Sequence, residues 1–120
     1  MNEAEMKDRT KKFSLRVMKM VGSLPNTNVA RVIGNQVLRS GTSVGANYRA
    51  ACRARSKAEF SSRLGVVEEE ADETSYWIEL LMDGDILPKR RLTPLLTESN
   101  ELVAMVTVSR VTLSRNKSKI

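Results

Sequence analysis

The stretch QVLRSGTSVGANYRAACRARSKAEFSSRLGVVEEEADETSYWIELL, residues 36–81, decides the fold of this 120-residue chain. On either side of Ser56, apolar residues recur at the three- and four-residue spacing of helices that bury one face. Ser56 is also a residue type that commonly caps a helix N-terminus. The stretch therefore predicts two antiparallel helices, over about 29–55 and 57–82, joined by a turn near Ser56.

The residues on either side of this hairpin predict one further helix each. Apolar residues share one side of a helix over about 5–22, which ends before the turn-forming stretch SLPNTN. Thr93 followed by Pro94 is typical of an N-cap and a first helical turn, and predicts a fourth helix over about 94–115. The basic residues 116–120 are expected to form a frayed tail.

Four helices with short connections predict an all-α fold, an antiparallel up-down-up-down four-helix bundle in a single domain of residues 1–120. The hydrophobic fraction of 41% and the charged fraction of 28% are ordinary for a folded chain. No run approaches the roughly 18 apolar residues of a membrane span, and the N-terminal MNEAEMKDRTKK lacks the apolar core of a secretory signal. The protein is therefore expected to be cytoplasmic, with no membrane partner.

Charge is distributed unevenly along a chain whose formal net charge is +6. Residues 9–58 contain 11 basic side chains and no acid, whereas residues 59–85 contain nine acids and a single base, Arg63. Such blocks are commonly solvated helix faces. They also suggest an acidic and a basic surface that meet each other between subunits or meet a polyanion.

The second predicted helix has three distinct faces when its residues are placed at roughly 100° intervals. One face lacks side chains and allows another helix to come close, which predicts close helix packing or a contact between subunits. Its glycines are Gly34, Gly41 and Gly45. The arginines of a second face are Arg31, Arg39, Arg49 and Arg53. The third face points to the core and carries small polar groups among its apolar residues.

Polar side chains of this helix have charged partners available on the next one. In a hairpin with this turn, positions whose numbers sum to about 112 lie opposite each other, so Arg39 is level with Glu73. Ser43 lies level with Glu69 or Glu70. Unpaired burial of such groups costs about 1–3 kcal/mol each, so we predict an inter-helix polar network, which either fixes the helix register or forms a ligand site. Its residues are Gln36, Arg39, Ser43, Asn47, Glu70, Glu73 and Trp77.

The sequence offers no assembled catalytic group. It contains no histidine, which excludes Ser-His and Cys-His pairs and the Glu-x-x-His ligands of a di-iron bundle. The single cysteine, Cys52, lies among alanines and is expected to be a packing residue rather than a nucleophile. The acids of residues 68–73 fall on different sides of one helix. We therefore predict a protein that is not an enzyme, with no catalytic residue, no metal and no cofactor.

The spaced pattern of residues 36–81 resembles the signature of the four-helix-bundle proteins known as 23S rRNA intervening-sequence proteins, and the helix NELVAMVTVSRVTLSRNK also fits. The matching residues are Gln36, Arg39, Ser40, Ser43, Asn47, Ser56, Phe60, Leu64, Glu70, Glu73, Tyr76 and Trp77. The resemblance implies a ring-shaped homopentamer whose biochemical role is poorly defined. It also implies a relation to the accessory variability determinants of diversity-generating retroelements, which are basic, pentameric and partner a reverse transcriptase and nucleic acid. Ala50 departs from the pattern, because family members often carry an acid there.

Two functions without catalysis remain open. The first is an oligomer, expected to be a homopentamer, that binds RNA or DNA through phosphate contacts, because few aromatic residues are available to stack on bases. The candidate contacts are Arg31, Arg49, Arg53, Arg55 and Lys57. The alternative is an oligomeric scaffold or accessory subunit for another protein, such as one that processes nucleic acid.

Overall fold

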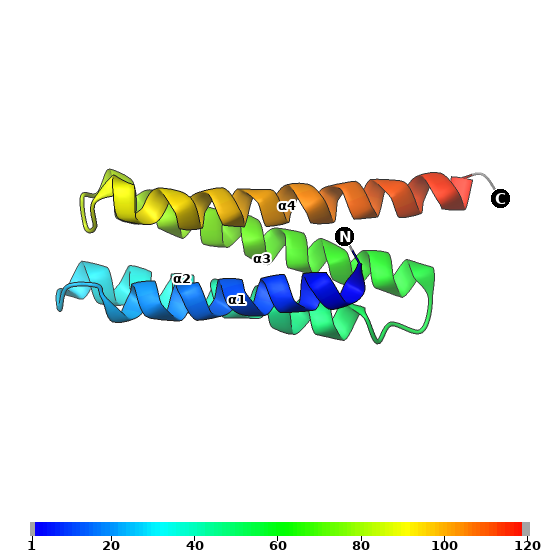
Figure 1. The fold of residues 1–120 in the computed structure, drawn as a ribbon, viewed down its shortest axis with the longest axis horizontal. Coiled ribbons are helices and arrows are strands. Elements are labelled where there is room, and N and C mark those ends of the chain that lie inside the picture. The colour runs from blue at the N-terminus through cyan, green and yellow to red at the C-terminus, as the bar shows by residue number, and fades with distance from the viewer. Residues whose placement is uncertain (1, 119–120) are drawn as a thin grey trace.

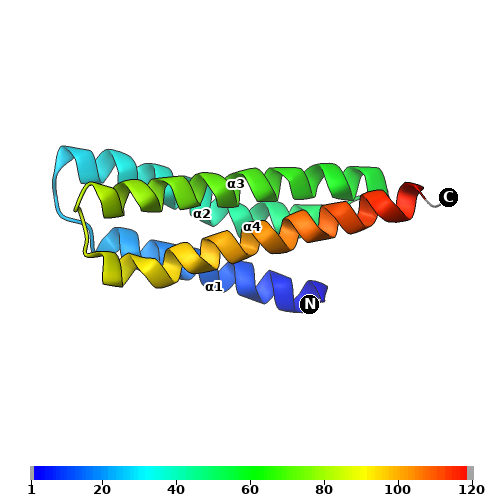
Figure 2. The same ribbon diagram turned by 90° about the horizontal axis from the view of Figure 1, so that it is seen from above.

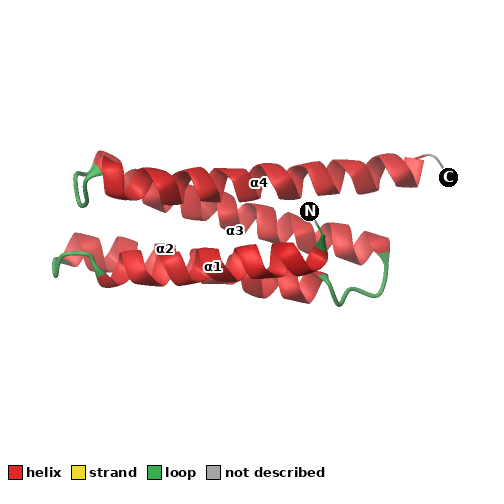
Figure 3. Ribbon diagram, viewed as in Figure 1, coloured by secondary structure: helices red, strands yellow, loops and turns green. Residues whose placement is uncertain are grey.

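The computed structural model describes residues 2–118 of the chain. Its four helices are α1 (Glu3–Gly22), α2 (Asn28–Ala51), α3 (Lys57–Asp83) and α4 (Lys89–Ser118), with no strand in the described range (Figures 1 and 3). They run alternately up and down a narrow bundle of 54 × 22 × 21 Å. The predicted all-α four-helix bundle is therefore confirmed.

The helices are arranged so that α1 and α3 are diagonal to each other. α1 packs against α2 and α4, and α3 also packs against α2 and α4. Within residues 2–118, the backbones of α1 and α3 are not in contact with each other. α4 is the longest helix, and its C-terminal end extends beyond the N-terminus of α1 (Figures 1 and 2).

Three helices begin at side-chain caps. Asn2 accepts a hydrogen bond from the amide of Glu5 at the start of α1. Ser56, the predicted cap, accepts from the amide of Glu59 at 3.0 Å. The cap of α2 is Thr27, which accepts from the amide of Ala30 at 3.2 Å, rather than the expected Asn28. The predicted starts of α2 and α3 are thus correct to within a residue.

α2 ends at Ala51, four residues before the predicted end at Arg55. The amides of Arg53 and Ala54 bond carbonyls only three residues back, which tightens the chain into the turn. The amide of Arg55 is already used by α3, because it donates to the Glu59 carboxylate at 2.9 Å. The last residues that the apolar pattern assigned to α2 therefore belong to the turn and to the N-terminal cap of α3.

α4 begins at Lys89, five residues before the predicted start at Pro94. Thr93 does not cap the helix, since its hydroxyl donates to the carbonyl of Lys89 at 2.7 Å. Leu92 is fully buried one turn before the buried Leu95. Burial of a leucine stabilises by about 1.5–3 kcal/mol, which offsets much of the cost of placing Pro94 inside the helix.

The other end of α4 also differs from the prediction. The helix continues through Ser118, where the sequence predicted a frayed tail over 116–120. Residues 119 and 120 of that tail lie outside the described residues.

The core is aliphatic, as the composition suggests. Its largest fully buried apolar side chains are Phe13, Leu64, Ile78, Leu81, Leu92 and Leu102. Each of the four helices contributes buried residues to this one cluster. No helix of the described chain has a stretch both long and apolar enough to cross a membrane.

Candidate functional site

The three glycines of α2 pack against α1 of the same chain. A Cβ atom on Gly41 would lie 2.8 Å from both methyl carbons of Val17, and one on Gly34 would lie 2.8 Å from Cδ1 of Leu24. On Gly45, it would lie 3.4 Å from the backbone of Thr10. The predicted close packing is therefore present, but these buried glycines offer no surface to a second subunit, because α1 covers them.

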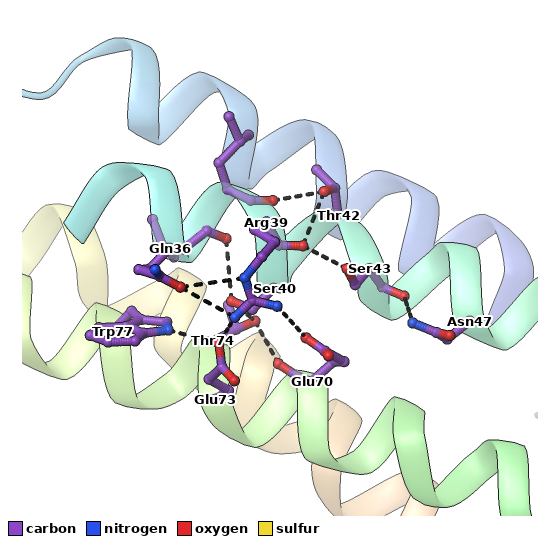
Figure 4. A network of polar contacts seen from close by, with 12 residues as sticks. Gln36, Arg39, Ser40, Thr42, Ser43, Asn47, Glu70, Glu73, Thr74 and Trp77 are labelled. Carbon is purple, nitrogen blue, oxygen red and sulfur yellow. Dashed lines mark hydrogen bonds and ion pairs between the residues drawn. The ribbon is translucent and has the colours of Figure 1, made fainter. Parts of the chain in front are cut away.

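Arg39 is the centre of a polar network between α2 and α3 (Figure 4). Its guanidinium donates to Glu73 and, at 3.4 Å, to Oε2 of Glu70. It also donates to Oε1 of Gln36 at 3.3 Å, and the indole of Trp77 donates to Glu73 at 3.0 Å. The structure thus joins five of the predicted network residues. The Arg39 side chain is 49% exposed, so this network lies at the surface rather than in the interior.

Ser43 and Asn47 do not join this network. The Ser43 hydroxyl donates to the carbonyl of Arg39 at 2.7 Å, and the Asn47 amide donates to the carbonyl of Ser43 at 2.9 Å. Both side chains therefore bond their own helix, which is a common alternative for short polar side chains. Neither bond requires α3, so these two predicted network residues are satisfied within α2.

The interior contains hydroxyl contacts that the network prediction missed. Thr74 of α3 donates to Ser40 of α2 at 2.9 Å. Ser75 of α3 donates to Ser99 of α4 at 2.7 Å, and Ser99 donates to the carbonyl of Ala71 at 2.9 Å. All four hydroxyls are buried. The available signal was the presence of small hydroxyl residues at core-facing positions, but periodicity alone does not distinguish a hydroxyl pair from packing.

α1 and α4 are joined by Arg9, whose contacts with Glu98 and Glu101 were not predicted from the sequence. Its guanidinium makes two hydrogen bonds of 2.7 Å to the two oxygens of Glu98 and a third of 2.6 Å to Glu101. The bidentate geometry is the stronger form of an arginine–carboxylate contact. The hydrogen bond from Arg9 lowers the pKa of Glu98, which is itself only 15% exposed.

The predicted nucleic-acid contacts are all exposed, but they do not form one stripe. Arg31 and Arg49 lie on the same face of α2, and 18 residues of helix separate them by about 27 Å. Arg39, the arginine between them, is paired with Glu70 and Glu73 of α3. Four of the five predicted residues gather where α2 turns into α3, namely Arg49, Arg53, Arg55 and Lys57. Arg31 lies at the opposite end of α2.

Further cations adjoin this turn from both neighbouring helices. Lys7 and Lys11 of α1 line an open groove of about 510 Å³ with Arg49. Arg63 of α3 lines a second groove with Arg53 and Arg55, where Ala50 also lies. We call this surface the basic end, and its residues are Lys7, Arg49, Arg53, Arg55, Lys57 and Arg63. Lys7 and Arg63 are not predictable from the sequence as part of this surface, because their proximity to Arg49 and Arg53 depends on how the helices pack.

A third hollow, at the same end of the bundle, is apolar. It has a volume of about 650 Å³, and its walls include Met6, Phe60 and Met105. Cys52 also lines it, and burial raises the pKa of the thiol. A protonated thiol is a poor nucleophile, which agrees with the interpretation of Cys52 as a packing residue. Within the described residues, no cluster of three or more acidic, cysteine or histidine side chains is placed to hold a metal ion.

Comparison with known proteins identifies the chain. Residues 2–108 match the model of the family described as 23S rRNA-intervening sequence protein. A solved structure from Bacteroides thetaiotaomicron, described as a protein of unknown function from the S23 ribosomal protein family, superposes with a TM-score of 0.81. It is 34% identical, and the match covers 87% of this chain and 96% of that one. Among proteins with curated descriptions, none matches significantly. The chain therefore belongs to the 23S rRNA-intervening sequence protein family.

Proposed function

We propose that this protein is a homo-oligomer, a homopentameric ring, that binds RNA or DNA through the basic end without strong sequence specificity. The basic end carries the proposal. Six cations from α1, α2, the α2–α3 turn and α3 gather there, and they outnumber the two carboxylates that line the grooves among them, those of Asp8 and Glu59. Such a cluster attracts a phosphate backbone.

The chemistry of the basic end favours phosphate contacts over base recognition. Tyr48, the aromatic residue of α2 near this end, is buried and cannot stack on an exposed base. Arg55 lies in the turn between α2 and α3, and Lys57 is the first residue of α3. Neither residue therefore lies along the side of a helix that could enter a groove of a nucleic acid. Binding is therefore expected to depend on salt more than on sequence. The name of the family refers to an intervening sequence of an RNA, which is consistent with a nucleic-acid partner.

The first prediction tests this proposal with fluorescently labelled RNA and DNA, each titrated at salt concentrations from about 50 to 200 mM. Log affinity should fall linearly with log salt, with a slope of about 0.9 for each phosphate neutralised on a duplex. Arg49→Glu should weaken binding at low salt by about tenfold or more and make the slope shallower, because it removes a contact and adds repulsion.

Arg31→Glu is the matched control, since it makes the same charge change on the same helix face at the far end of α2. It should change affinity much less than Arg49→Glu. Equal effects of the two variants would mean that net charge, and not the basic end, governs binding. Circular dichroism and light scattering should show that both variants keep the helix content and the mass of the parent protein.

A scaffold for another protein is the second candidate function. It is favoured by exposed apolar side chains, among them Val29, Val32 and Tyr76, which a nucleic acid would not require. A protein that processes nucleic acid, such as the reverse transcriptase with which accessory variability determinants associate, is the proposed partner class. Absence of binding to both RNA and DNA at low salt would reject the first function in favour of this one.

A further inference from the structure

We infer that the outer face of α1 binds the outer face of α3 on a second copy of this chain. The inference rests on the oligomer in the proposed function and names the two surfaces that build it. The outer face of α1 includes the exposed Lys12, Leu15, Met18 and Lys19, together with Asp8, which forms a salt bridge with Lys12. Leu15 and Met18 are 53% and 52% exposed, which is unusual for neighbouring large apolar side chains on a helix surface.

The outer face of α3 has the complementary charge. Tyr76 is 52% exposed at its centre and stands edge-on to Trp77, with ring centroids 5.1 Å apart. The acids around Tyr76 are Glu69, Asp72, Glu79 and Asp83, all exposed. Among the described residues, none of these four acids takes part in a salt bridge. Tyr76, surrounded by acids, is therefore complementary to Leu15 and Met18, which are flanked by lysines. The apolar side chains can pack together while the opposite charges around them attract.

The diagonal placement of α1 and α3 determines the type of contact. Because both helices pack against α2 and α4 and not against each other, their outer faces point to opposite sides of the bundle. Two acidic faces repel each other, as do two basic faces, so like faces do not pair. Each copy therefore offers its α1 face to one neighbour and its α3 face to another, which is a heterologous contact.

The heights of the two faces along the bundle determine whether such contacts close into a ring. Gly41 packs on Val17 of α1, and the adjacent Ser40 bonds Thr74 of α3, so Val17 and Thr74 lie at about the same height. α1 and α3 run in the same direction. Counting from this level, Lys12 is level with Glu69, Leu15 with Asp72, and Met18 with Ser75, each within about 3 Å.

This agreement in height is one condition for a closed ring, and the second is that the rotation from copy to copy closes. A rotation about an axis parallel to the bundle, with no shift along it, brings Leu15 and Met18 of one copy beside Tyr76 of the next. The same rotation places Lys12 level with Glu69. A contact that required a shift along the axis would instead build a helical filament.

The second prediction tests the two faces with one variant on each. Leu15→Asp and Tyr76→Asp change residues that are more than half exposed, so both variants should keep the helix content of the parent protein. Each alone should reduce the mass in light scattering to that of the 13.4 kDa chain. An equimolar mixture should form a dimer and nothing larger, because one intact α1 face and one intact α3 face remain.

Three outcomes separate the possibilities. If the parent protein is itself monomeric across dilution, the oligomer of the proposed function fails, and this contact fails with it. If the parent protein is oligomeric but neither variant changes its mass, the ring stands and these two faces are rejected. Val29→Asp is the matched control, because Val29 is 58% exposed on α2 and belongs to neither face; it should leave the mass unchanged.

Discussion

Arg9 closes the contact between the first and last helices of the bundle with three hydrogen bonds to two carboxylates. Sequence periodicity does not predict this contact, because Arg9 and Glu98 lie 89 positions apart and each is an ordinary surface residue type. The geometry makes Glu98 a better acceptor when ionised than when protonated. The stability of the bundle should therefore depend on the ionisation of Glu98.

The third prediction concerns the acid stability of this contact. The folded pKa of Glu98 is lowered from 4.5, so its contribution to stability is present at neutral pH and is lost as the pH falls through that lowered pKa. Glu98→Gln should lower the unfolding midpoint at pH 7 and make stability less dependent on pH below about 5. Thermal unfolding between pH 7 and pH 3, followed by circular dichroism, measures both effects.

Asp85→Asn is the control for this experiment, since Asp85 is exposed between α3 and α4 and takes part in none of the salt bridges of the described residues. It should change neither the midpoint at pH 7 nor its pH dependence by much. If Glu98→Gln and Asp85→Asn give the same pH profile, Arg9 does not stabilise the ionised form of Glu98.

The fourth prediction concerns Arg39 and Glu73, which the sequence correctly placed opposite each other. The side chains are 49% and 38% exposed, so the pair is partly shielded, as expected, but water still weakens its attraction. A double-mutant cycle with Arg39→Ala and Glu73→Ala should give a coupling of about 0.2–1 kcal/mol in urea unfolding. Coupling within error of zero would show that the contact does not stabilise the fold.

The apolar faces of the helices are the part of the elements that the sequence predicts best. Residues such as Leu64, Ile78 and Leu102 are buried as the spacing requires, because one buried stripe is a local property of an amphipathic helix. The helix ends are less predictable. α2 ends early because the amide of Arg55 donates to Glu59 at the start of α3. α4 starts early because Leu92 is buried in the core. Both depend on tertiary contacts.

The glycine face of α2 is another feature that the sequence predicts only in part, because the helix that packs on it depends on the tertiary structure. The sequence predicts that another helix comes close at Gly34, Gly41 and Gly45, but it does not say which helix. In the structure, the helix is α1, and Ser14 of α1 donates to the carbonyl of Gly41 at 3.3 Å. The close approach therefore holds one chain together and is not a subunit contact.

The fifth prediction follows from this contact. A leucine at Gly41 cannot fit, because even its Cβ atom would lie 2.8 Å from two carbons of Val17. Gly41→Leu should therefore lower the free energy of unfolding by about 1–3 kcal/mol or more. Gly22→Ala is the control, since nothing lies within 4 Å of its Cβ position. Urea unfolding monitored at 222 nm should show a large loss for the first variant and little or none for the second.

At the scale of the whole molecule, charge segregation is the feature that sequence and structure share most directly. The acid-free residues 9–58 supply most of α1 and all of α2, and the acidic residues 59–85 supply most of α3. The sequence pattern did not separate Arg31 from Arg49, which the length of α2 places at opposite ends of the helix. Nor did it show that Lys7 and Arg63 join Arg49 and Arg53, since they come from different helices.

The up-and-down order of the helices also bears on how the chain folds during synthesis. Each helix packs against the one that precedes it, and α4 alone must also reach back to α1. Bundles built from such local contacts fold in microseconds to milliseconds. A ribosome adds about 5–20 residues per second, so α1 and α2 can pair before α3 has emerged. The Arg9–Glu98 contact can form only after α4 is made, which places the closure of the bundle at the end of translation.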